Sequence, residues 1–255
     1  MFFNKRPKTA TWHKQSWEYY NISAVALEAE HTLIAGYTGC GKSTFLRSII
    51  QAMIAKYSPA EAKMIIIDVK QTDLEKCAPL PHTIRYADDL DKTAEALDYA
   101  LRLMTERQAE RRRKGDEVYN GARLYIIIDE LNPILTDHYD KKRSARSQFC
   151  IEQIVSLGRS ANIHLIACTQ NPNKKTLPAN ISDNCICRFG LHCMTPIQSR
   201  QIILQSGCES LAKYGEALAI IDGELGLYKL PYVTQADIKP LIDYWRSPQA
   251  VTYGY

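Results

Sequence analysis

The stretch that decides the fold reads Gly36-Tyr37-Thr38-Gly39-Cys40-Gly41-Lys42-Ser43. It fits the pattern G-x-x-x-x-G-K-[ST] at every position, and it follows the apolar residues 31–35, which are typical of a short buried strand. The residues after it, 45–54, carry apolar side chains at three- and four-residue spacing and predict a helix with one buried stripe. A strand, a glycine-rich loop and a helix in this order direct backbone N–H groups at phosphate oxygens.

The same stretch predicts a site for ATP and Mg²⁺. We expect the nucleotide to contact the whole loop and the residue after it, namely Gly36, Tyr37, Thr38, Gly39, Cys40, Gly41, Lys42, Ser43 and Thr44. Lys42 would hold the β- and γ-phosphates, and the hydroxyl of Ser43 would bind Mg²⁺. A chance glycine-rich turn before a helix is the weaker interpretation, because strand, loop, Lys-Ser pair and helix are all in register.

A second chemical feature lies at residues 124–130, where an apolar run ends in Asp129 and Glu130. A buried strand that presents two adjacent carboxylates at its end suits ATP hydrolysis. Asp129 would help to hold Mg²⁺, and Glu130 would polarise the attacking water. Such an acidic pair is a weak signal alone, but it is a strong one downstream of a matching phosphate-binding loop.

The polar residues Asp68 and Lys70 lie at the end of another apolar run, 63–69, of the kind found in the middle of a parallel sheet. Ligands bind at the carboxyl ends of the strands in an open parallel sheet. These two side chains therefore either face a ligand or form a polar cap on a buried strand. The first strand, its helix and this second strand together predict a βαβ unit.

The whole pattern predicts an α/β domain with a mainly parallel central sheet, flanking helices and a C-terminal β-hairpin. Further strands are expected over 23–27 and 163–168, a hairpin over 217–221 and 225–230, and helices over 90–114, 147–157, 196–204 and 236–245. We assign residues 1–21 to an arm or edge strand, 22–245 to the domain and 246–255 to a short tail.

Composition is that of a globular protein, with 45% hydrophobic and 24% charged residues. No apolar run approaches the roughly 20 residues that cross a bilayer, so we expect a cytoplasmic protein without a membrane span and with its cysteines reduced.

The odd-numbered residues from Cys185 to Cys193 follow the two-residue period of a strand with one buried face. We favour such a strand over a metal site.

The net charge of +4 does not by itself indicate nucleic-acid binding. Basic residues gather at 111–114, where they suit the negative end of a helix dipole, and again at 141–146. A solvated helix end is the commoner explanation of such clusters. Our candidates for contact with DNA are Lys141, Lys142, Arg143, Arg146, Lys174 and Lys175.

Taken together, these motifs resemble the motor domain of the FtsK/SpoIIIE family, within the HerA/FtsK group of P-loop ATPases. The resemblance is carried by residues 33–43, 67–70, Met104 with Arg107, 126–131 and 158–170, and it extends over roughly 22–232. It implies a RecA-like fold and an ATPase that pumps double-stranded DNA through a ring, usually a homo-hexamer. A protein that recruits the motor to its DNA is a further candidate partner.

The resemblance also implies roles for two residues within 158–170. Arg159 becomes the candidate arginine finger, which would reach the γ-phosphate bound by the adjacent subunit. Gln170 becomes the candidate sensor of that phosphate. The alternatives are a surface arginine after a helix end and a glutamine that begins a loop.

The chain departs from the family pattern at two places. Asp68-Val69-Lys70 stands where Asp-Pro-Lys is common, and Asn171-Pro172 follows Gln170 where Arg-Pro is frequent. With no further module apparent, we expect a minimal motor that serves a mobile element, plasmid or phage. Two alternatives stay open: an FtsK-like ATPase that moves a protein client, as in type VII secretion, and an ATP-binding assembly or coupling module that does not translocate anything.

Overall fold

The computed structural model describes residues 22–71, 74–173 and 176–247. The predicted arm over 1–21, most of the predicted tail, and the candidate DNA contacts Lys174 and Lys175 lie outside the described residues. Within the described ranges no helix is long and apolar enough to cross a membrane.

The described strands form one eight-stranded sheet in the order β3-β2-β4-β5-β1-β6-β7-β8. The strands are β1 (His31–Ala35), β2 (Ala62–Ile67), β3 (Thr83–Ala87), β4 (Arg123–Ile128), β5 (Ile163–Thr169), β6 (Cys187–Gly190), β7 (Glu216–Ile221) and β8 (Glu224–Lys229). The first six in chain order are parallel, and β7 and β8 complete the sheet as an antiparallel hairpin. The predicted α/β class, the mainly parallel sheet and the C-terminal hairpin are confirmed.

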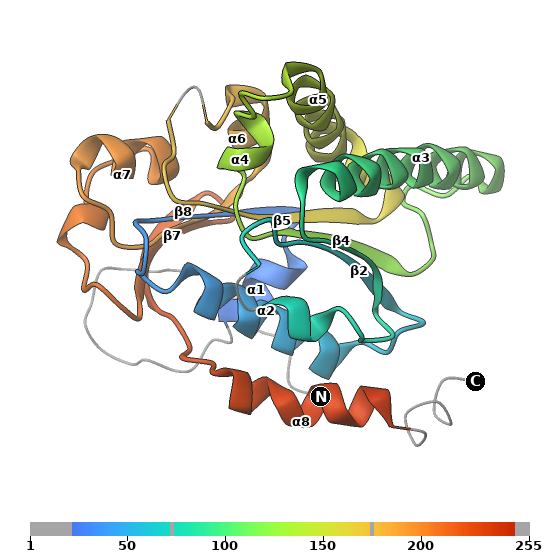
Figure 1. Cartoon of the computed structure of the whole chain (residues 1–255), viewed down its shortest axis with the longest axis horizontal. Coiled ribbons are helices and arrows are strands. Elements are labelled where there is room, and N and C mark those ends of the chain that lie inside the picture. The colour runs from blue at the N-terminus through green and yellow to red at the C-terminus, as the bar shows by residue number, and fades with distance from the viewer. Residues whose placement is uncertain (1–21, 72–73, 174–175, 248–255) are drawn as a thin grey trace.

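Helices cover both faces of this sheet (Figure 1). One face carries α1 (Ile22–Glu28), α2 (Lys42–Lys56) and α8 (Gln235–Arg246), and the other carries α3 (Leu90–Lys114), α4 (Asn132–Leu135), α5 (Lys141–Leu157) and α6 (Ala179–Asn184). Helix α7 (Pro196–Ile203) packs beside β6 and β7, and three short 3₁₀ helices are η1 (Leu74–Cys77), η2 (Gly158–Ala161) and η3 (Cys208–Ser210).

A hydrophobic core lies on each face of the sheet, and this explains why the sequences of the central strands are continuous apolar runs. Along β4, Tyr125 and Ile127 belong to the core under α2, whereas Ile126 and Ile128 belong to the core under α3 and α5. Burial on both faces makes every position apolar until the strand ends. The strand then delivers Asp129 and Glu130 to the carboxyl edge of the sheet, which is the edge where the phosphate-binding loop follows β1.

Two predicted strands differ from the structure. Residues 23–27 form helix α1 instead, in which Ile22, Ala26 and Leu27 lie on one buried face, and Ser23 hydrogen-bonds Ser48 of α2 over 2.7 Å. The strand predicted over the cysteine-rich stretch is confirmed only as β6, Cys187–Gly190. Among the described residues, no three or more His, Cys, Asp or Glu side chains come together in a group that could hold a metal ion.

Candidate active site

The phosphate-binding loop joins the carboxyl end of β1 to the first turn of α2. Gly39 and Gly41 have φ angles of 76° and 103°, in the left-handed region that favours glycine. A Cβ added at either residue would meet no described heavy atom within 4 Å, so the backbone angle and not lack of space favours glycine here. The Nζ of Lys42 donates to the backbone oxygens of Gly36 at 2.8 Å and Tyr37 at 3.0 Å, so its ammonium lies within the loop.

Cys40 is packed into the base of this loop. Its side chain is 2% exposed, and burial raises the pKa of the thiol. A Cβ at Gly36 would lie 2.7 Å from the Cys40 Sγ and 2.8 Å from the Cβ of Leu191, so the loop can close only over a glycine. Cys40 therefore supports the loop by packing, and its backbone N–H donates to the backbone oxygen of Tyr37 at 3.2 Å.

Asp129 and Ser43 meet at the start of α2. The Oγ of Ser43 donates to Oδ1 of Asp129 over 3.2 Å, joining the loop to the end of β4. Burial and then the nearby carboxylate of Asp68 raise the pKa of Asp129. Oxygen ligands in a site of excess negative charge suit a hard divalent cation. The two residues predicted to bind Mg²⁺ are thus adjacent and chemically fit for it.

Glu130 lies beside this pair and is 4% exposed. Its Oε1 accepts the backbone N–H groups of Asn132 at 3.3 Å and Gln170 at 3.2 Å, and its Oε2 accepts from Nζ of Lys70 at 3.0 Å. A second contact ties the end of β5 to the phosphate-binding loop, because the hydroxyl of Thr38 donates to Oε1 of Gln170 over 2.8 Å. Gln170 therefore touches both halves of the site.

An open cavity of about 650 Å³ lies over these groups. It is lined by Tyr37, Thr38, Val69, Lys70, Glu130, Asn132, Pro133, Gln170, Asn171 and Gln198. The sequence placed Lys70 at the ligand edge but gave it no specific role, and it did not single out Asn132 or Gln198. Asn132 follows the acidic pair by two positions and could have been found there, whereas Gln198 comes from the distant helix α7 and has no local signal.

Arg159 does not lie near this cavity. It belongs to η2, which precedes β5, whereas Gln170 follows the same strand. The seven residues of β5 separate the two ends by about 20 Å. The Nε of Arg159 pairs with Oε1 of Glu30, just before β1, at 2.8 Å, and 75% of the arginine side chain is exposed. Arg159 is thus at the opposite edge of the sheet from Lys42 and Glu130.

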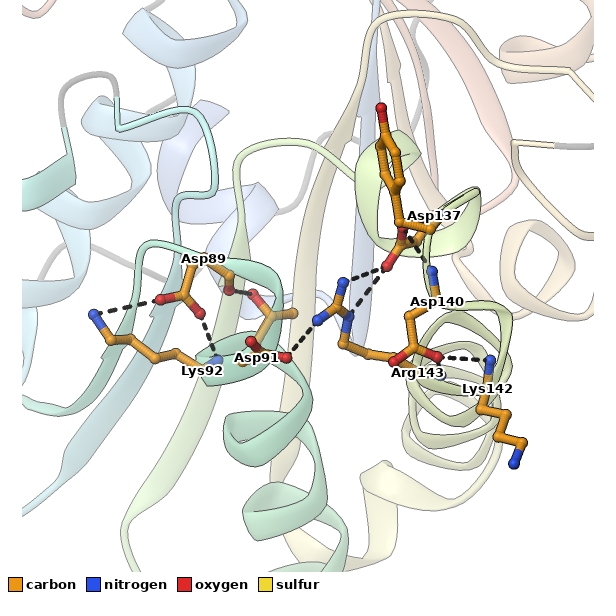
Figure 2. Close-up of polar contacts among 9 residues, drawn as sticks. Asp89, Asp91, Lys92, Asp137, Asp140, Lys142 and Arg143 are labelled. Atoms are coloured by element: carbon orange, nitrogen blue, oxygen red, sulfur yellow. Dashed lines mark hydrogen bonds and ion pairs between the residues drawn. The ribbon is translucent and has the colours of Figure 1, made fainter.

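The basic cluster at the start of α5 is partly engaged in ion pairs, as Figure 2 shows. The guanidinium of Arg143 lies between Asp137, at 2.6 Å, and Asp91 at the start of α3. Arg146 pairs with Asp98 of α3 at 2.7 Å. Lys141 and Lys142 are exposed. Two of the predicted DNA contacts therefore bind α5 to its neighbours, and contact with DNA stays a prediction for all of them.

The FtsK/SpoIIIE family profile matches residues 9–123 of this chain. DNA translocase FtsK of Helicobacter pylori strain J99 is 29% identical over 239 residues, which are 88% of this chain and 28% of that protein. DNA translocase FtsK of Caldanaerobacter subterraneus subsp. tengcongensis is 33% identical over 199 residues, 74% of this chain and 27% of that protein. The chain thus spans little more than a quarter of these relatives.

Solved structures share the fold at lower identity. The pCW3 conjugation coupling protein TcpA, solved with ATPγS, superposes with a TM-score of 0.75 at 18% identity, over 86% of this chain and 66% of TcpA. The cytoplasmic domain of the type VII secretion ATPase EccC of Thermomonospora curvata gives a TM-score of 0.70 at 20% identity, over 85% of this chain and 28% of EccC. At these identities the likeness supports the fold alone.

Proposed function

Because this chain is a P-loop ATPase domain of the FtsK/SpoIIIE family, we propose that it is the motor unit of a ring that moves double-stranded DNA. The observation that carries the DNA client is the match to DNA translocase FtsK proteins over as much as 88% of the chain. The ring is supported by the position of Arg159, which lies too far from Lys42 and Glu130 to serve its own site.

The geometry supports a division of labour among the residues of the cavity. Lys42 and backbone N–H groups of the loop would bind the β- and γ-phosphates of ATP. Ser43 and Asp129 would hold Mg²⁺, which when bound supplies positive charge to the phosphate oxygens. Glu130 would orient the attacking water and accept its proton, because its carboxylate lines the cavity. Gln170 would sense whether the γ-phosphate is present, because its side chain is hydrogen-bonded to Thr38 of the phosphate-binding loop.

Arg159 would complete the site of a neighbouring subunit. Its guanidinium is exposed and, in the part of the chain that the structure describes, pairs with the carboxylate of Glu30, so another subunit can approach it. A guanidinium supplied from outside stabilises the charge that spreads over the transferred phosphoryl group, and it makes hydrolysis depend on the subunit interface. A ring of six identical subunits would repeat this arrangement at every interface.

DNA would be held by its phosphate backbone rather than read by base sequence. Lys141 and Lys142 are exposed and lie outside the ion pairs that engage Arg143 and Arg146. Asp140 fixes the start of α5 by accepting from the backbone N–H groups of both Lys142 and Arg143. Lysine contacts to phosphates release counterions, so their contribution falls as salt is added. We place such a motor in the service of a plasmid, phage or other mobile element, with a recruiting protein.

Steady-state ATP hydrolysis with and without long linear duplex tests this proposal. We expect duplex DNA to raise the turnover rate several-fold at about 50 mM salt, and the stimulation to fade towards 200 mM because counterion release then favours binding less. Glu130→Gln serves as the blank. Glu130-dependent turnover that ignores DNA at both salt concentrations would contradict the DNA client and favour a protein client, as for the EccC ATPase solved in complex with a signal sequence peptide.

A further inference from the structure

The carboxylate of Glu130 is held by a second charged side chain for which the proposed function has no role. Among the described residues, the donors that reach Glu130 are two backbone N–H groups, from Asn132 and Gln170, and the ammonium of Lys70. The Glu130 side chain is only 3% exposed, whereas that of Lys70 is 35% exposed at the wall of the cavity. Lys70 thus supplies the cationic partner of this nearly buried carboxylate.

The chain that carries Lys70 is held firmly beside the site. After β2, the N–H of Asp68 donates to the backbone oxygen of Ala87 on β3 at 2.8 Å, and the N–H of Gln71 closes a turn on the Asp68 oxygen at 2.9 Å. Gln71 adopts a φ of 51°, in the left-handed region, and this bends the chain sharply after Lys70. The ammonium is therefore presented to Glu130 from an anchored turn.

Charge explains why a cation is needed at this point. Asp68, Asp129 and Glu130 are 0%, 5% and 4% exposed, and they gather at the ends of the neighbouring strands β2 and β4. A carboxylate removed from water among other carboxylates is costly unless a cation or donors compensate it. The ammonium of Lys42 is engaged with the backbone of the phosphate-binding loop, so Lys70 is the lysine that serves Glu130.

A carboxylate offers about four acceptor positions on its two oxygens. The two N–H groups and the ammonium take three of them, which leaves one position on a side chain that lines the cavity. A water in the cavity could donate to that position while the three contacts keep the carboxylate from turning. The contacts therefore both hold the base and leave it a place for one water.

We infer that Lys70 is a positioning residue for ATP hydrolysis, whose ammonium holds the Glu130 carboxylate aimed into the cavity. This inference rests on the proposed role of Glu130 as the group that orients the attacking water. Lys70 acts through Glu130, so its loss should reduce the rate of the chemical step and leave the phosphate-binding loop intact.

The test replaces Lys70 by methionine, which keeps the length of the side chain and removes its charge. We expect kcat to fall about 10- to 100-fold, while KM and the affinity for ATP stay within about threefold, because a misplaced catalytic group costs turnover rather than binding. Lys70→Arg should recover much of kcat. The matched control is Lys63→Met, on β2 itself, where the ammonium contacts the backbone oxygen of Pro81 at 3.1 Å, away from the cavity. This variant should keep wild-type kcat.

Unchanged or increased kcat in Lys70→Met would overturn the inference, and an increase would mean that Lys70 masks Glu130. Glu130→Gln, measured alongside, separates a failure of the role of Glu130 from a failure of the role of Lys70. If Glu130→Gln hydrolyses ATP normally, the proposed role of Glu130 fails. If Glu130→Gln is inactive and Lys70→Met is normal, only the role of Lys70 fails.

Thermal unfolding gives a readout that does not depend on activity. Lys70→Met should lower Tm by a few degrees where Glu130 is present, because it leaves a buried carboxylate without its cation. In the Glu130→Gln background the same substitution should change Tm far less, since the two residues are coupled. Equal Tm shifts in both backgrounds would mean that the contact between Lys70 and Glu130 is not the cause of the lower Tm, and would overturn the inference.

Discussion

Replacing Lys42 by alanine is expected to lower the affinity for ATP at least about 100-fold. The ammonium makes two hydrogen bonds inside the phosphate-binding loop, to Gly36 and Tyr37. The same donors can turn to phosphate oxygens, and hydrogen bonds that involve a charged group contribute about 1.5–3 kcal/mol each. Equilibrium titration with a fluorescent ATP analogue measures the loss directly.

Lys56→Ala provides the matched control for this variant. Lys56 is the last residue of the same helix, α2, and its ammonium pairs with Glu28 at 2.6 Å, far from the loop. We expect its affinity for ATP to match that of the wild type. An affinity within about threefold of wild type in Lys42→Ala would contradict the assignment of the phosphate site, because removing a charged donor from a phosphate should cost more than that.

The second large effect is expected from Glu130→Gln, with a fall in kcat of about 10²- to 10⁴-fold, the range that general-base catalysis contributes. The amide keeps the shape of the side chain but cannot accept a proton from water. Binding of ATP should stay within about threefold of wild type, because the phosphate contacts come from the loop after β1. Phosphate release under saturating ATP measures kcat, and the titration used for Lys42 measures binding.

Glu106→Gln is the control for this charge removal. Glu106 is exposed on α3, outside the residues that line the cavity, so its substitution should leave kcat unchanged. Normal turnover by Glu130→Gln would show that Glu130 is not the general base. A loss of ATP binding as large as the loss of kcat would instead assign Glu130 to nucleotide binding.

The features that the sequence predicted correctly are those encoded by neighbouring residues. Glycines at fixed spacing before Lys42 indicated the loop, and an apolar run indicated the buried strand that ends at Asp129. The helix predicted over 90–114 is α3, which Asp89 caps by accepting from the backbone N–H of Lys92. Each of these patterns involves residues close together in the chain, so it can be recognised without knowledge of the tertiary structure.

The features that the sequence did not predict depend on contacts between distant segments. Lys70 and Glu130 are 60 positions apart and meet because β2 and β4 are adjacent in the sheet. The basic residue Arg143 resembled a free surface charge until its partners on two other segments were known. Helix α1 was mistaken for a strand because its few apolar residues gave no clear period, and packing against α2 decided its conformation.

Mixing two inactive variants tests most directly whether Arg159 completes the ATP site of a neighbouring subunit. Arg159→Ala keeps an intact ATP site but offers no guanidinium to its neighbour, whereas Glu130→Gln offers the guanidinium but cannot hydrolyse ATP. Each alone should show little turnover. An equal mixture that exchanges subunits should recover about a quarter of the wild-type rate per subunit, because an intact site then meets an intact Arg159 at one interface in four. Turnover in the mixture no higher than the mean of the separate variants, or full turnover by Arg159→Ala alone, would contradict a site completed between subunits.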